Sequence, residues 1–208
     1  MNKEKLNFLE IAFLAGVLTA VSFYFGLFSG LENFIEDSLF SSKPVHQDIV
    51  IVTIDDDSIG RIGQWPWPRQ VFAKALSELQ KNPPKAVGID VIFSEPSRYG
   101  NGDDAALAEV LNKISFPVIL PVEAKPLILE KNNLPRAGKF LKPLLVFESA
   151  KSVTLGQVNL ILDADGVVRR FPIKADSYNA MSYEIAKKSG LGISGEADLK
   201  FINKIVFS

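Results

Sequence analysis

The residues whose chemistry could matter follow two apolar runs of the chain and fill the loop between them. They are Asp55, Asp57, Ser58, Trp65, Trp67, Arg69, Asp90 and Glu95. Carboxylate oxygens can bind a divalent cation, indole rings can clamp a ligand, and an arginine can pair with an acid. We therefore treat these eight residues as a tentative ligand-binding site, to which we assign no catalytic residue, metal or cofactor.

Each of these residue types also has a purely structural explanation. Asp57 or Ser58 can begin a helical turn, because carboxylates and hydroxyls at strand ends often satisfy loop amides. The two tryptophans can cover the rim of a small core while Arg69 bridges Asp90 or Glu95. The sequence alone leaves both explanations open.

Two strands and one helix must position these residues. The apolar runs 49–54 and 86–89 are typical of buried strands, and Val71, Ala75, Leu76 and Leu79 between them recur at helical spacing. Such a unit closes as a right-handed parallel crossover, and ligand crevices lie outside the carboxyl ends of the strands. We therefore expect the acidic strand ends and the tryptophan loop to meet on one rim.

The rest of the chain predicts one mixed-sheet α/β domain with a βαβαβ core and a C-terminal β-hairpin plus helix. Asp163–Gly166 contains an Asp-Gly pair, which is a strong hairpin signal. Segment 125–139 is polar and without period, so we interpret it as an excursion from the fold. The remaining expected elements are helices from 103, over 143–150 and over 178–189, and strands over 116–122, 153–161, 167–174 and 199–208.

An uncharged N-terminal run predicts a membrane anchor. Residues 11–31 carry no charge and match the length of a helix that spans a bilayer. Lysines before the run and acids after it favour a cytoplasmic N-terminus and an exported main domain. The predicted organisation is a cytoplasmic segment 1–10, a transmembrane anchor 11–31, a stalk and linker 32–42, and an extracytoplasmic domain 43–208 at the cytoplasmic membrane.

The same run suggests self-association. Small residues recur along it at spacings of three and four, and such seams let membrane helices approach closely. Apolar positions of 31–40 extend the pattern as an amphipathic stalk. We expect a homodimer through this helix, with the lipid bilayer as a second partner.

Composition excludes several classes of function. The chain has 208 residues, no cysteine, a single histidine and a net charge of −1. Disulfides, thiolate metal sites and metal sites that need several histidines of one chain are therefore excluded. The near-zero charge gives no sign of a nucleic-acid partner. The sequence also contains no nucleophile elbow and no Gly-rich phosphate loop, so we do not expect an enzyme.

Several motifs, taken in order, resemble a known family. They are Asp-Ile-Val-Ile-Val-Thr-Ile-Asp-Asp-Asp-Ser, Trp-Pro-Trp-Pro-Arg, Gly-Ile-Asp-Val-Ile-Phe-Ser-Glu-Pro, Asp-Ala-Ala-Leu-Ala, Gly-Gln-Val-Asn and Asp-Gly-Val-Val-Arg-Arg. Together they resemble the CHASE-type extracellular sensor domain, type 2. The resemblance marks Asp55, Ser58, Trp65, Arg69, Asp90 and Glu95 as family-typical without giving them a role. It implies a bacterial receptor whose cytoplasmic output is a cyclase, a kinase or a diguanylate cyclase.

The resulting hypothesis is a signal-input domain that senses a small ligand or the state of the cell envelope. Its output domain is not recognisable in this chain and would lie in another segment or a partner. Two alternatives stay open. One is an anchored envelope hydrolase that uses carboxylates and a divalent metal, and the other is a structural module without a ligand.

Overall fold

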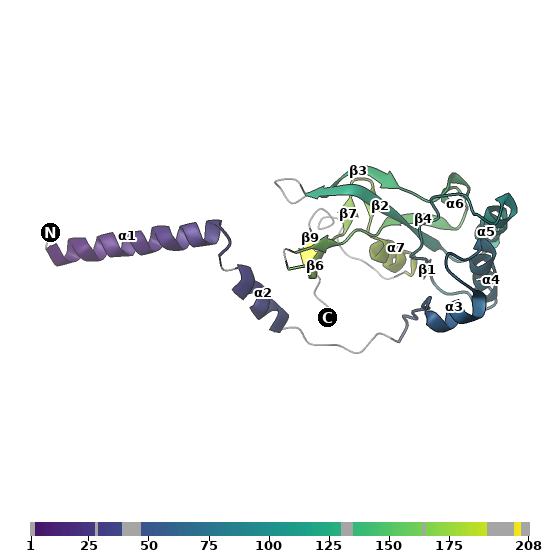
Figure 1. The fold of residues 1–208 in the computed structure, drawn as a ribbon, viewed down its shortest axis with the longest axis horizontal. Coiled ribbons are helices and arrows are strands. Elements are labelled where there is room, and N and C mark those ends of the chain that lie inside the picture. The colour runs from purple at the N-terminus through teal and green to yellow at the C-terminus, as the bar shows by residue number, and fades with distance from the viewer. Residues whose placement is uncertain are drawn as a thin grey trace. The chain divides into compact units, whose positions relative to one another are not determined.

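The computed structural model describes residues 3–27, 29–38, 47–129, 135–163, 165–190 and 202–204. Two compact units make up the chain, one of residues 1–50 with 206–208 and one of residues 51–205. Figure 1 shows the helices of the first unit and the mixed sheet and helices of the second. The predicted boundary at residue 43 lies outside the described residues.

The first unit contains two helices, α1 (Lys3–Tyr24) and α2 (Ser29–Ser38). A turn follows α1 at 25–27, where Gly26 adopts a left-handed φ of 64°. Glycine takes this conformation without the steric cost that other residues incur. The uncharged run therefore does not form one continuous helix.

The predicted transmembrane helix is wrong for this structure. Among the described residues, no helix is both long enough and apolar enough to cross a membrane. The reason lies in the turn, because the uncharged part of α1, residues 11–24, measures only about 21 Å at 1.5 Å per residue. The hydrocarbon core of a bilayer is about 30 Å thick.

Three parallel strands form the centre of the second unit. In chain order, these strands and the helices between them are β1 (Val87–Gly88), α5 (Asn101–Lys113), β2 (Val118–Leu129), α6 (Leu145–Glu148) and β4 (Val153–Gln157), with the antiparallel strand β3 (Pro135–Leu141) between β2 and α6. β2 pairs in parallel with β1 and with β4, so it occupies the middle. The prediction of a mixed-sheet α/β fold is confirmed, and a βαβαβ core is present, although it begins one strand later than expected.

The segment 49–54 differs from its prediction. It belongs to no strand of the described residues, and Val50 and Val52 are 82% and 87% exposed. The β-branched composition indicates a preference for extended backbone. Composition does not indicate whether a neighbouring strand is within hydrogen-bonding reach, and this is where the prediction was wrong.

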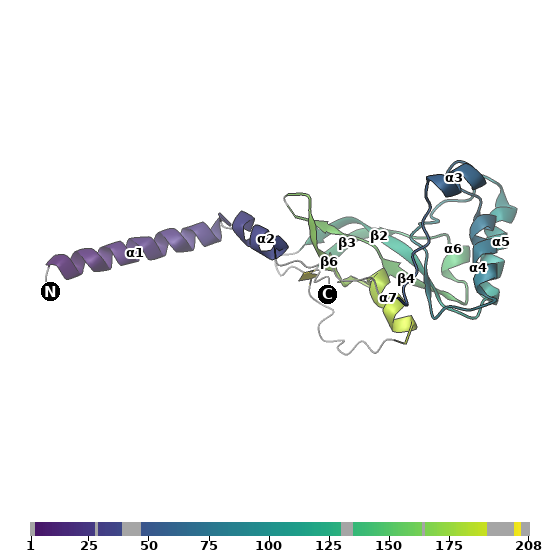
Figure 2. The same ribbon diagram turned by 90° about the horizontal axis from the view of Figure 1, so that it is seen from below.

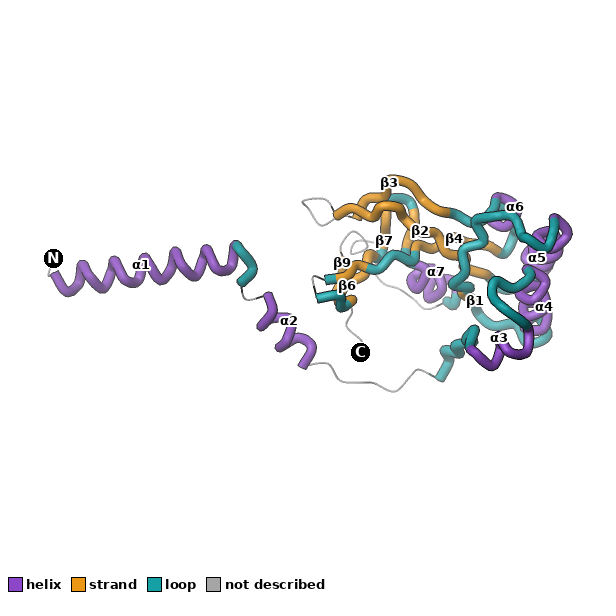
Figure 3. Tube along the Cα trace, in the orientation of Figure 1, coloured by secondary structure: helices purple, strands orange, loops and turns teal. Residues whose placement is uncertain are grey.

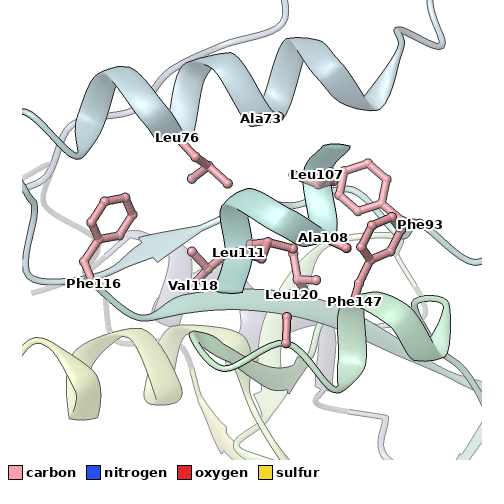
Figure 4. Packing of buried hydrophobic residues seen from close by; sticks show 11 residues of the cluster. Ala73, Leu76, Phe93, Leu107, Ala108, Leu111, Phe116, Val118, Leu120 and Phe147 are labelled. Atoms are coloured by element: carbon pink, nitrogen blue, oxygen red, sulfur yellow. The ribbon is translucent and has the colours of Figure 1, made fainter. Parts of the chain in front are cut away.

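One face of the sheet is covered by helices. α4 (Arg69–Leu79), predicted from its apolar spacing, buries Ala73 and Leu76 and packs beside α5. α5 contributes Leu107 and Leu111, both fully buried, as is Phe147 of α6. Figure 4 shows these side chains meeting Phe93, Phe116, Val118 and Leu120 in one hydrophobic core.

The opposite face receives α7 (Met181–Lys188), which lies within the helix predicted over 178–189. This helix approaches the strands so closely that Gly156 is required by a backbone contact, whereas at Gly88 the close atoms are the ends of flexible side chains. A Cβ on Gly156 would lie 2.5 Å from the Met181 Cα, and one on Gly88 would lie 2.5 Å from the Ile185 Cδ1. The sheet is therefore covered on both faces, as expected for parallel strands.

A two-stranded ribbon forms the described parts of the segment 125–139, which we interpret above as an excursion. β2 continues to Leu129 and pairs antiparallel with β3 (Pro135–Leu141), with Glu123 opposite Leu141. The interpretation of 125–139 as irregular is therefore wrong. Its polar composition reflects exposure, because Lys125 and Lys139 are solvent-exposed ribbon positions that face each other across the strands.

The C-terminal part forms small antiparallel sheets. The predicted hairpin at Asp163–Gly166 is confirmed, since the amide of Gly166 donates to the carbonyl of Asp163 at 2.9 Å. The predicted strand 153–161 is divided into β4 and β5, and only part of 199–208 is described. The sheets comprise β5 (Ile161–Leu162), β6 (Val168–Pro172) and β9 (Ile202–Lys204), and β7 (Lys174–Ala175) with β8 (Tyr178–Asn179).

Candidate functional site

The acidic end of the segment 49–54 starts a helix. Asp55 is the N-cap of α3 (Asp56–Ile62): its Oδ1 accepts from the Ser58 amide at 2.9 Å, and the Ser58 Oγ accepts from the Asp55 amide at 2.8 Å. The hydrogen bond from the Ser58 amide lowers the pKa of Asp55. Capping of this helix, one of the two explanations above, is therefore confirmed, with Asp55 as the cap.

The other carboxylates of the predicted rim are exposed to solvent and take no part in the cap. Asp57 is exposed in the first turn of α3, Asp90 is exposed just after β1, and the Glu95 side chain is exposed on the following loop. Within the described ranges, no group of three or more acidic or histidine side chains could hold a metal ion. The carboxylates thus give no support to a divalent-metal site.

The two tryptophans occupy different environments in their loop. Trp67 is buried and its Nε1 donates to the Gly63 carbonyl at 2.6 Å, which ties the loop to the end of α3. Trp65 remains 38% exposed, with its ring centroid 5.7 Å from that of Trp67 and 6.2 Å from that of Phe72. Phe72 in turn packs edge-on against Phe93 of the core. The loop therefore covers the core edge, as the structural explanation predicted.

Arg69 begins α4 and points into the protein. Its Nε donates to Asp104 Oδ1 at 3.3 Å, its Nη2 donates to the Glu95 carbonyl at 3.1 Å, and its guanidinium lies 4.5 Å above the Phe93 ring. The ion-pair partner is thus Asp104, whereas we expected Asp90 or Glu95. Glu95 contributes only through its backbone carbonyl in these contacts.

A buried carboxylate from α5 caps α4. The N-cap of α4 is Pro68, whose side chain makes no capping hydrogen bond. Asp103 of α5 supplies the missing acceptors: it receives the Arg69 amide at 2.7 Å and the Gln70 amide at 2.9 Å. A carboxylate is favourable here because the helix N-terminus carries partial positive charge. The cap of one helix is therefore a residue of its neighbour.

Ser97 completes this arrangement. Its hydroxyl donates to Asp103 Oδ2 at 2.5 Å, and its amide donates to Asp104 Oδ2 at 2.8 Å. All four carboxylate oxygens of Asp103 and Asp104 consequently accept hydrogen bonds, although both residues are buried. We call Arg69, Ser97, Asp103 and Asp104 the ionic cluster.

The ionic cluster favours the charged form of Asp103. Burial opposes the ionisation of Asp103, but hydrogen bonds from Ser97, Arg69 and Gln70 and the charge of Arg69 outweigh it, so the pKa of Asp103 is lowered. A carboxylate with satisfied oxygens and a low pKa is poorly suited to general acid or base work near neutral pH. The cluster is a connection between helices.

Three exposed side chains gather outside the cluster. Arg98 Nη2 and the Tyr99 hydroxyl both donate to the Pro66 carbonyl, at 3.0 and 3.2 Å, and the Arg98 guanidinium lies 5.0 Å from the Tyr99 ring centroid. Pro66 precedes Trp67 and follows the exposed Trp65. We call Trp65, Arg98 and Tyr99 the rim patch. It presents two aromatic rings and one positive charge.

Sequence reasoning found some of these residues and missed others. It selected Trp65, Trp67 and Arg69, and it placed the acids at 103 and 104 in a first helical turn without recognising their role. Ser97, Arg98 and Tyr99 carried no signal by themselves. A pair of acids heading an apolar helix was the available signal, but whether they turn towards solvent or towards another helix depends on tertiary packing.

The Gly156-Gln-Val-Asn159 motif is also structural. The Asn159 side chain donates to the Ala124 carbonyl at 3.0 Å and accepts from the Ala124 amide at 2.8 Å, as a neighbouring strand would. Gln157 is buried, accepts the Asn159 amide at 2.8 Å and donates to the Pro172 carbonyl. This motif extends the pairing along β2 beyond the end of β4.

The second unit therefore combines an α/β fold with a fully bonded ionic cluster and an exposed rim patch. The chain belongs to the CHASE2 family: the family model described as CHASE2 domain matches residues 12–204. CHASE2 domains are extracellular-type sensory domains of signalling receptors, and the family is not a catalytic one. Neither the curated proteins nor the solved structures contain a match to the chain.

The ionic cluster generates a prediction for Asp103→Asn. Losing the charged acceptor should lower the free energy of unfolding at pH 7 by about 1–3 kcal/mol. Because the folded-state pKa is lowered, the stabilisation is present above the unfolded pKa of about 3.9 and disappears as pH falls through the folded value. Urea unfolding of both proteins between pH 7 and about pH 3 should therefore show the difference shrinking below about pH 4.

Glu109→Gln in the same helix is the matched control. Glu109 forms an exposed pair with Lys113, and such surface pairs contribute about 0–1 kcal/mol. A loss at Asp103→Asn no larger than this control, or one that does not change with pH, would show that the cluster does not stabilise the fold through its charge.

Proposed function

We propose that the unit of residues 51–205 is a signal-input module that binds a small molecule at the rim patch. The observation that carries this proposal is the arrangement of Trp65, Arg98 and Tyr99, which are all exposed. Arg98 and Tyr99 are held by the Pro66 carbonyl, and Trp65 packs against the rings of Trp67 and Phe72. Exposed aromatic rings held in place bind with little loss of side-chain entropy. Trp67 and Arg69, both in the predicted ligand-binding site, would not contact the ligand. They would support the rim patch by fixing the loop and the start of α4.

The expected ligand has a flat or apolar face and an acceptor or anionic group. Aromatic rings offer the first a stacking surface, and Arg98 offers the second a donor and a positive charge. Signalling then follows from a difference in ligand affinity between two arrangements of the protein, passed to a cyclase, kinase or diguanylate cyclase output. Membership of a sensory family supports this, and the hydrolase alternative loses support because that family is not catalytic.

Intrinsic fluorescence tests the ligand site directly, because both tryptophans of the chain lie in this loop. Amino acids, sugars and dicarboxylates would be titrated into the full chain. We expect one class to change the emission saturably. Arg98→Ala and Tyr99→Ala should then weaken its binding by about tenfold or more each, equivalent to about 1.4 kcal/mol.

Lys81→Ala is the control, since Lys81 forms an exposed ion pair with Glu78 at the C-terminal end of α4, outside the rim patch. It should leave the titration unchanged. A compound that calorimetry shows to bind equally well to wild type, Arg98→Ala and Tyr99→Ala would place the ligand site elsewhere. Absence of binding across all the compounds would instead support the structural module without a ligand.

We also propose that the chain forms a homodimer through α2 of the first unit. Leu31, Phe34 and Ile35 share one face of this helix and are 57%, 70% and 49% exposed. Apolar side chains at this spacing form the seam by which helices pair. A second copy offers the same seam, so both copies would bury it in a symmetric contact.

Disulfide trapping tests the dimer, because the chain contains no cysteine of its own. Leu31→Cys and Ile35→Cys should form cross-linked dimers under mild oxidation. Asn33→Cys, on the other side of α2, should form few. Equal yields at all three positions would contradict a dimer through this face.

A further inference from the structure

An apolar segment of the second unit lies uncovered. Ile51, Val52 and Ile54 expose 76%, 87% and 41% of their surface, and Figure 3 draws the segment as a loop leading into α3. Only Thr53 interrupts the apolar series, so both faces of this segment would be apolar if it were a strand. Runs that are apolar on both faces are typical of strands in parallel sheets, which are covered on both sides.

The sheet has an open edge of matching character. Among the described strands, β1 pairs only with β2. The amides of Val87 and Ile89 donate towards β2, to the carbonyls of Pro117 and Ile119. The residues that alternate with them, Gly88 and Asp90, are exposed. Val87, Ile89 and Val91 pack on the core below, so β1 has the composition of an interior strand at an edge position.

Topology indicates which segment belongs at this edge. α4, α5 and α6 all contribute to one core on the same face of the sheet, and the strands follow in the order β1, β2, β4. When successive right-handed crossovers place their helices on the same face of a sheet, the strands are added in one direction across the sheet. The strand that precedes α4 must then lie on the side of β1 away from β2.

The rim contacts are consistent with that position. Asp55 directly follows the segment and caps α3. The Trp67 indole is hydrogen-bonded to Gly63, just after α3. Arg69, at the start of α4, is hydrogen-bonded to the Glu95 carbonyl, which lies beyond β1. The segment therefore ends at the same rim at which α4 begins and the β1 segment ends. A parallel strand in this crossover requires that arrangement.

We infer that the open edge of β1 is a binding surface for a β-strand, and that its occupant is this chain's own segment Ile51–Ile54. In the docked state the segment is a fourth parallel strand, with α4 on one face. The structure described here shows the undocked state of this segment. The inference rests on topology and exposure and does not depend on the ligand site or the dimer proposed above.

Amide hydrogen exchange of the full chain tests this inference. We expect the amides of 51–54 to exchange at least about tenfold more slowly than the same amides in a peptide of residues 47–58. Val52→Asp should abolish this protection and also speed exchange at Gly88 and Asp90, because it places a charge in the docked strand. Leu145→Asp changes a side chain that is also highly exposed, at 76%, and should alter neither region.

Two results would overturn the inference. One is exchange of 51–54 at the rate of the free peptide in the wild-type chain. The other is protection that increases with protein concentration, because the occupant would then be a second copy. Protection that is independent of concentration and is lost in Val52→Asp supports docking within the chain.

Discussion

The structure of the second unit depends on the carboxylate of Asp103, a residue of α5 that caps the N-terminus of α4. Pro68 cannot cap α4 with a side chain, so the first amides of this helix need an acceptor from elsewhere. Asp103 provides it, and Asp104 neutralises the Arg69 side chain at the same turn. Two helix N-termini and the loop at Ser97 are thereby fixed to one another, with the hydrophobic core directly below.

The position of the rim patch follows from this connection. α4 starts where the ionic cluster holds it, and the Trp65–Pro68 loop leads into that start. Arg98 and Tyr99 follow Ser97, whose amide donates to Asp104 and whose hydroxyl donates to Asp103. A ligand that displaced Trp65 or Arg98 would therefore affect the positions of both α4 and α5. Figure 2 shows α3, α4 and α5 together at one end of the unit.

Sequence patterns predicted the local elements well and their tertiary partners less well. The spacing of Ala75, Leu76 and Leu79 predicted α4, and the Asp-Gly pair at 165–166 predicted the hairpin, because both signals are local. The single helix over 11–31 failed at Gly26, since an uncharged run does not show where a left-handed turn divides it. The strand over 49–54 failed for a different reason, because pairing requires a neighbour that composition does not specify.

The candidate site was predicted in part for the same reason. Trp65, Trp67 and Arg69 were selected because rare or charged residues stand out in a loop. Asp103 and Asp104 looked like ordinary acids in a first helical turn, where the helix dipole alone explains them. Their burial, and the choice of Arg69 as partner over Asp90 or Glu95, are properties of how α4 packs on α5.

The most direct test of this account is a double-mutant cycle between Arg69 and Asp104. Urea unfolding of wild type, Arg69→Ala, Asp104→Ala and the double variant gives the coupling energy of the pair. A largely buried pair with side chains 13% and 11% exposed should couple by about 1–3 kcal/mol. The exposed pair of Glu78 and Lys81 should couple by no more than about 1 kcal/mol. Equal coupling in both cycles would contradict the claim that the ionic cluster holds α4 and α5 together.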